Sequence, residues 1–189
     1  RSRLKEYRVP YFDKKHKHEH IALSGGDTVC TSELVKSVRD FTVRSVYVDV
    51  EYSFVRGAEK TGNYFEVTIL DIGDRDIGIG LAVRGKFPTK GEMPGWVDHS
   101  YGLHGDDGRR FGGSGTVSET GWPIWNKNDV IGCGINFSDR SIFYTLNGTL
   151  LGIAFADVGD DTLHPVIGFH CPTKAQSVRI NFGLYPFHY

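Results

Sequence analysis

The stretch at residues 129–155 constrains the fold most strongly, because its pattern predicts consecutive antiparallel strands. An Asn147-Gly148 pair separates two apolar runs, at 142–146 and 150–155. Asn-Gly between apolar runs favours a type I′ hairpin turn, in which both central residues have positive φ. This corner fixes the register of the hairpin and therefore decides which side chains share a face of the sheet.

A third strand is expected immediately before the hairpin, at residues 130–137, joined to it by a polar turn at 138–140. In this strand apolar side chains alternate with Gly132 and Gly134, so that one face is continuously apolar and the other is nearly bare. A three-stranded meander with one apolar face needs a second sheet to cover that face. The stretch therefore predicts half of a two-layer structure.

Composition and length agree with a single all-β domain. The chain has 189 residues, of which 24 are glycines, a number that suits short strands and many turns. The net charge is -1, so we expect neither a nucleic-acid partner nor a membrane. Cys30, Cys133 and Cys171 are distant from one another and odd in number, which favours a reducing, intracellular compartment, cytoplasmic or nuclear.

The rest of the chain reads as further short strands without a convincing long helix, and this pattern predicts a β-sandwich of two antiparallel sheets. Residues 31–39 could form a short helix capped by Ser32 or a loop. Residues 1–20 are interpreted as a solvated lead-in, followed by one domain at 21–189. The expected strands, besides the meander, are 21–23, 44–51, 63–71, 77–83, 100–103, 109–112, 163–171 and 176–182.

Histidines at alternate positions of the lead-in invite a metal-site interpretation. His16, His18 and His20 would share one face of an extended segment, as metal ligands can. The intervening lysines repel a cation, so the stronger interpretation is a solvated segment. No metal and no cofactor are expected.

Several phrases of the sequence, taken together and in order, resemble the SPRY domain family. The likeness covers about residues 21–187, and the HGDDG and PGW phrases are most like the RanBPM (Ran-binding protein) branch, whose members scaffold a multi-subunit ubiquitin ligase. The phrases are YFEV at 64–67, IGIGL at 77–81, PGW at 94–96, SYGLHGDDG at 100–108, DVIGC at 129–133, FY at 143–144, NG at 147–148, LGIAF at 151–155, NFG at 181–183 and PF at 186–187.

The resemblance implies a bent β-sandwich, no catalysis, and a surface of loops at one edge that binds a short peptide of a partner protein. Carried over by position, this surface lies around residues 33–40, 86–101 and 169–171. The candidate partner-binding residues within it are Glu33, Lys36, Arg39, Lys86, Met93, Trp96, Tyr101, Phe169, His170 and Cys171.

Tryptophans in the two long loops are further candidates, because a large amphipathic ring is an efficient peptide anchor. Trp122 and Trp125 join Trp96 in this group. The alternative for each ring is that it folds back and plugs the end of the sandwich.

A carbohydrate-binding or carbohydrate-hydrolysing sandwich is the alternative function, with Asp106 or Glu119 as the acid and loop tryptophans against the sugar rings. Two adjacent carboxylates, Asp106 and Asp107, lie in a glycine-flanked turn near His104. Adjacent carboxylates in one turn point in different directions, so turn formation is the stronger interpretation and no catalytic residue is expected.

Overall fold

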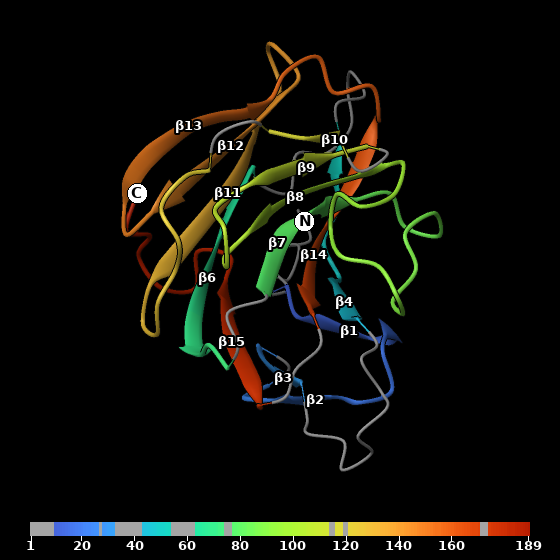
Figure 1. Ribbon diagram of the computed structural model, residues 1–189, viewed down its shortest axis with the longest axis vertical. Coiled ribbons are helices and arrows are strands. Elements are labelled where there is room, and N and C mark those ends of the chain that lie inside the picture. The colour runs from blue at the N-terminus through green and yellow to red at the C-terminus, as the bar shows by residue number, and fades with distance from the viewer. Residues whose placement is uncertain are drawn as a thin grey trace, which may run out of the picture.

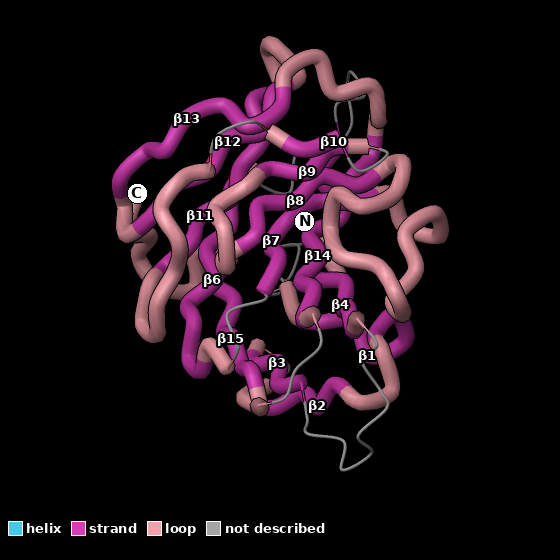
Figure 2. Tube along the Cα trace, in the orientation of Figure 1, coloured by secondary structure: helices cyan, strands magenta, loops and turns pink. Residues whose placement is uncertain are grey.

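The computed structural model describes residues 10–26, 28–32, 43–53, 63–73, 77–113, 116–118, 121–170 and 174–189. Within these ranges the chain forms strands and turns and no helix (Figures 1 and 2). The all-β prediction is therefore confirmed. The same described residues contain no apolar helix that could span a bilayer.

The strands of the described residues form two antiparallel sheets (Figure 1). The eight-stranded sheet has the order β1 (Phe12–Lys17), β4 (Arg44–Val48), β14 (Thr162–Phe169), β7 (Ile77–Ala82), β8 (Ser100–His104), β9 (Arg110–Gly112) and β10 (Thr116–Val117), with β5 (Tyr52–Ser53) also paired to β14. The seven-stranded sheet has the order β13 (Thr149–Phe155), β12 (Ser141–Leu146), β11 (Val130–Asn136), β6 (Tyr64–Asp71), β15 (Gln176–Asn181), β3 (Val29–Ser32) and β2 (Ile21–Ser24).

The predicted meander is present as β11, β12 and β13. Asn147 and Gly148 have φ values of 50° and 80°, as a type I′ turn requires. The register pairs Cys133 with Tyr144, so alternate residues of both strands face the second sheet. The local sequence pattern therefore sets this half of the sandwich.

Apolar side chains from both sheets meet in one buried core. Ile79 and Ile167 of the eight-stranded sheet belong to the same cluster as Val67 and Ile131 of the other sheet. The Tyr144 hydroxyl also crosses the interior and donates a hydrogen bond to the Ile79 carbonyl oxygen, at 3.0 Å. Two sheets joined in this way give the loops between their strands a fixed base.

Two sequence interpretations are corrected by the strand assignment. Residues 12–17 of the expected solvated lead-in form β1, which pairs with β4 and buries Phe12. Thr31 and Ser32, which were placed in a helix or a loop, lie in β3, paired with β15, and residues 33–39 of that stretch lie outside the described residues. Both strands are short and carry polar residues, and their pairing with distant strands is what holds them extended.

Candidate functional site

The loop between β7 and β8 lies close against the outer face of the eight-stranded sheet. Three glycines on that face make the approach possible: a Cβ at Gly102 would overlap the Pro94 carbonyl group, and a Cβ at Gly78 or Gly168 would press on the Met93 and Pro94 side chains. Small residues in a strand mark places where another backbone comes close. The small residues of these strands therefore let the Met93 and Pro94 side chains lie directly on the sheet.

The Ser100 hydroxyl fixes the turn at Pro94-Gly95-Trp96 through two hydrogen bonds. The Gly95 backbone N–H donates to the Ser100 Oγ atom at 2.9 Å, and that hydroxyl donates to the Val97 carbonyl oxygen at 2.6 Å. Gly95 has a φ of 93°, a conformation that favours glycine. These constraints fix the backbone that carries the Trp96 ring, which lies near His104 of β8.

Trp96 meets His170 at the end of β14, although the two residues are far apart in sequence. Their ring centroids are 5.1 Å apart in an edge-to-face arrangement, and both rings are partly exposed. Beneath them lies His104, whose Nε2–H donates to the Pro94 carbonyl oxygen at 2.9 Å and whose ring stacks on Phe111. Burial lowers the pKa of His104, so this support is a neutral ring at pH 7.

A second, polar cluster borders the same loop. Asp160 accepts hydrogen bonds from the Tyr101 hydroxyl at 2.9 Å and from His99 Nδ1 at 2.6 Å. The other ring nitrogen of His99 lies 3.3 Å from the Lys86 ammonium group. Burial and the hydrogen bond to Asp160 raise the pKa of Tyr101, so its hydroxyl stays protonated and serves as a donor.

These two clusters are separated by the sheet itself. Gly102 faces the loop, so its neighbour Tyr101 points to the opposite face, where its ring packs against Phe155. The structure thus brings Trp96 and His170 together, and places Tyr101 with Lys86 in a different cluster. We call the outer-face surface around the partly exposed Trp96 and His170 rings the loop surface.

Three candidate residues are buried, and the expectation that they contact a partner is corrected. Met93 is 1% exposed, and Phe169 and Trp125 are completely buried. Met93 fills the space above Gly78 and Gly168, and Phe169 belongs to the core. The Trp125 ring folds inward over Gly105 and joins the core. It therefore fills the interior, which was the alternative to peptide binding for a loop tryptophan.

Trp122 is partly covered by neighbouring side chains. The Arg110 guanidinium group sits 4.3 Å from its ring centroid, and its ring also approaches Tyr144 of the core. A cation over an aromatic face stabilises both side chains but shields the ring from other contacts. The candidates Glu33, Lys36, Arg39 and Cys171 lie outside the described residues.

Sequence reasoning missed His99 and Asp160 as members of the site. Sixty-one positions separate them, so no local spacing could indicate that they pair. The one local signal is the strained backbone of His99, whose φ is 61°, and dihedral angles are not readable from the sequence.

The acidic turn after β8 has a structural explanation. The Asp107 carboxylate accepts the Arg109 backbone N–H at 2.9 Å, and Gly108 has a φ of 67°. In the described part of the chain, no three His, Cys, Asp or Glu side chains gather as metal ligands would. Of the two acids considered for sugar hydrolysis, Asp106 is exposed in this turn and Glu119 lies outside the described residues.

Comparison with known families decides what kind of domain this is. The model of the SPRY domain matches residues 63–185. The chain belongs to the SPRY domain family. The resemblance to this family that the sequence suggested is therefore confirmed, and so is the likeness to its Ran-binding branch.

Among curated relatives, the SPRY chain is 46% identical to Ran-binding protein 9 of Homo sapiens over 125 residues, which are 66% of this chain and 16% of that protein. It is 43% identical to the Ran-binding proteins 9/10 homolog of Drosophila melanogaster over 127 residues, 67% of this chain and 13% of that protein. The chain therefore spans less than a fifth of either relative.

Solved SPRY domains share the architecture. A crystal structure of a human SPRY domain is 27% identical and superposes with a TM-score of 0.64, covering 89% of this chain and 98% of that one. The SPRY domain of human HERC1 has a TM-score of 0.70 at 14% identity, covering 93% and 99% of the two chains. The second likeness concerns the fold alone, and both support the bent two-sheet sandwich.

Proposed function

We propose that this SPRY domain is a non-catalytic interaction module that binds a short, extended peptide segment of a partner protein across the loop surface. The observation that carries the proposal is the pair formed by Trp96 and His170, two partly exposed rings supported by a buried layer. Partly exposed aromatic rings on a fixed backbone are effective anchors for a partner side chain.

The supporting layer explains why binding would cost little ordering entropy. Met93 and His104 are buried directly beneath the anchor, and the backbone of the loop is held by the glycine contacts and by Ser100. A surface that is already ordered before binding loses little freedom when a partner arrives. The affinity would come from one or two side chains seated against the rings, with loop backbone groups pairing with the peptide.

The biological setting that we propose follows from the relatives. Of the relatives reported above, Ran-binding protein 9 and the Drosophila homolog are the most similar in sequence, and the HERC1 SPRY domain shares the fold. The Ran-binding branch suggests a role as scaffold or substrate receptor in a ubiquitin ligase complex, inside the cell. In that role the loop surface would select the protein that the complex holds.

Affinity purification with matched variants tests the loop surface. Trp96→Ala and His170→Ala are each expected to weaken capture of a partner by about tenfold or more, because an anchor residue contributes about 2 kcal/mol. Lys127→Ala, an exposed residue outside the loop surface, is the control and should leave capture unchanged. If both variants captured the partner as strongly as the unaltered chain, the binding surface would lie elsewhere.

A further inference from the structure

The outer face of the seven-stranded sheet carries a shelf of aromatic side chains. Tyr64 of β6 and Phe143 of β12 lie parallel, with ring centroids 6.0 Å apart and an interplanar angle of 8°. Between them runs β11, where a Cβ at Gly132 would overlap the Tyr64 hydroxyl and a Cβ at Gly134 would overlap the Phe143 ring. Gly132 and Gly134 therefore leave the space on this face of β11 that the Tyr64 and Phe143 side chains fill.

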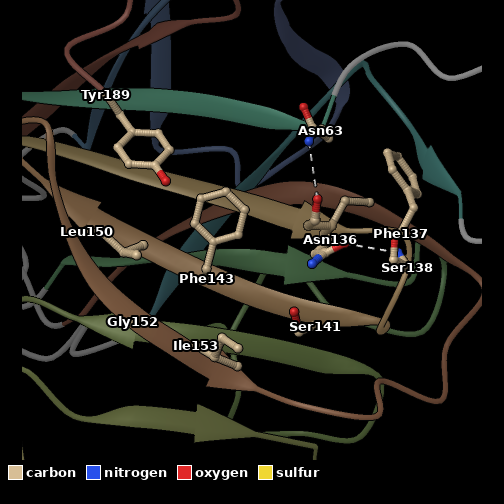
Figure 3. Close-up of a pocket in the computed structure, with 11 residues that line it drawn as sticks. Asn63, Asn136, Phe137, Ser138, Ser141, Phe143, Leu150, Gly152, Ile153 and Tyr189 are labelled. Carbon is tan, nitrogen blue, oxygen red and sulfur yellow. Dashed lines mark hydrogen bonds between the residues drawn. The ribbon is translucent and has the colours of Figure 1, made fainter.

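The last residues of the sequence lie across this shelf. The Phe187 ring meets Tyr64 edge-on, with centroids 4.9 Å apart, and the Tyr189 ring lies 5.5 Å from Tyr64 and 6.0 Å from Phe143. Figure 3 shows Tyr189 and Phe143 on the same side of the sheet. Residues 187–189 thus rest on Tyr64 and Phe143 through two aromatic side chains that flank His188.

A buried carboxylate binds the main chain of this segment. Glu66 is 2% exposed, and its Oε1 atom accepts the backbone N–H groups of His188 at 2.7 Å and of Tyr189 at 3.3 Å. The Tyr64 hydroxyl donates to the same oxygen at 3.2 Å, and His188 Nδ1 lies 3.0 Å from Oε2. Two consecutive N–H groups on one carboxylate oxygen select a backbone whose successive N–H groups point the same way, and the His188 ring adds a contact to the second oxygen.

The segment reaches this position through a turn built by Asn181. Its Oδ1 atom accepts the backbone N–H groups of Gly183 and Tyr185, at 3.1 and 3.2 Å, and its amide donates to the Tyr185 carbonyl oxygen at 3.0 Å. Gly183 has a φ of 89°, which suits the reversal. The turn sends the chain back over the sheet after β15.

The segment is held more loosely than a core strand. Tyr185 is 63% exposed and Tyr189 is 56% exposed, so most of their apolar surface remains in water. Segments with few buried apolar contacts open locally at a small fraction of the global unfolding free energy. Residues 187–189 can therefore leave the shelf while the sandwich stays folded.

A groove of about 400 Å³ continues from Tyr189 beyond the shelf. It is lined by Phe143, by the exposed Leu150 and Ile153 of β13, and by polar side chains such as Asn63 and Ser138 (Figure 3). This volume falls within the range of sites that hold small ligands or peptide side chains.

We propose that Tyr64, Glu66 and Phe143 form a second peptide-binding site, which takes a segment with an aromatic side chain on either side of one residue and two consecutive backbone N–H groups turned toward Glu66. Residues 187–189 occupy it in cis, and a partner segment of the same chemistry occupies it in trans when they leave. The Glu66 carboxylate favours such a segment, because departure of residues 187–189 removes the His188 and Tyr189 N–H donors, which the backbone of a partner segment can replace. This site lies on a different sheet from the loop surface and does not depend on it.

The test uses the full chain and a fluorescent, amidated peptide of the sequence YPFHY, which is that of residues 185–189. The double variant Phe187→Ala with Tyr189→Ala removes the cis rings and is expected to bind the peptide about tenfold more tightly than the unaltered chain. Adding Glu66→Gln should weaken that binding by about tenfold, since the charge-assisted hydrogen bonds are lost. Fluorescence anisotropy gives both ratios.

Two controls make the outcome specific. A peptide N-methylated at the positions of His188 and Tyr189 lacks the two donors and should not bind, whereas Trp96→Ala in the double variant should bind the unmodified peptide normally. Equal binding of the methylated and unmodified peptides, or no effect of Glu66→Gln, would overturn the proposal. If the unaltered chain self-associated through this segment, residues 187–189 of one copy would occupy the site of another copy. That result would overturn the cis assignment.

A measurement without peptide guards against misfolding of the variants. Hydrogen exchange of the His188 and Tyr189 amides in the full chain is expected to accelerate about tenfold in Glu66→Gln, while amides of β11 keep their protection. Unchanged exchange at these two amides would show that Glu66 does not hold the segment, and would contradict the proposal independently of any partner.

Discussion

Replacing Trp125 with alanine is expected to lower the free energy of unfolding by about 3–5 kcal/mol, the usual cost of deleting a large buried aromatic side chain. The ring is completely buried, belongs to the core, and rests on Gly105, where a Cβ would overlap it. A cavity of this size next to a tight turn cannot collapse without moving the backbone. Urea unfolding followed by tryptophan fluorescence and circular dichroism measures the loss.

Trp96→Ala is the matched control, since it deletes the same side chain from a partly exposed position. We expect it to cost about 1 kcal/mol or less. Equal losses for the two variants would contradict the assignment of one tryptophan to the core and the other to the surface. A stable Trp125→Ala protein that fails to bind its partner would restore Trp125 to the binding surface.

Gly102→Ala is expected to destabilise the domain by about 1–3 kcal/mol, the typical cost of overpacking a filled site, and to weaken partner binding as well. The added Cβ would overlap the Pro94 carbonyl group, so the loop that carries Trp96 must move away from the sheet. Both effects have one cause, and we expect them to appear together in urea unfolding and in affinity capture.

Gly159→Ala provides the comparison, because a Cβ there meets nothing within 4 Å. Its effect on unfolding is expected to stay within about 0.5 kcal/mol, as for ordinary surface changes. A Gly102→Ala protein that binds its partner normally would mean that the close packing of the loop on the sheet is not needed for recognition.

The meander could be predicted from the sequence because its determinants are local. An Asn-Gly corner and an alternation of apolar residues lie within one short stretch, and each follows from the geometry of a strand or a turn. The bare face of β11 could be predicted in the same way. What covers that face could not, because Tyr64 comes from a strand more than sixty residues earlier.

The edge strand β1 was missed for a physical reason. Its sequence, FDKKHK, is polar and charged because it lies at the edge of the eight-stranded sheet, where charged side chains protect a free edge from unwanted pairing. Such a strand lacks the alternating pattern that indicates half-burial. Only its register with β4 shows that it belongs to the sandwich.

The candidate site could be predicted at the level of the loops and not at the level of the residues. The resemblance indicated the long loop before β8 as part of a binding surface, but the structure places this loop on the outer face of β7, β8 and β14, and which of its side chains face outward depends on contacts with distant glycines. Met93 and Trp96 are only three positions apart, yet one is buried and the other partly exposed. The pairing of Trp96 with His170 likewise arises from sheet order, which a single sequence does not reveal.

The most direct test of the account is hydrogen exchange of the domain with and without a captured partner segment. We expect new protection at residues 86–101 and at His170, with the core strands unchanged. Protection confined to residues 143–155 and 187–189 would place the principal binding surface on the other sheet and contradict the central proposal.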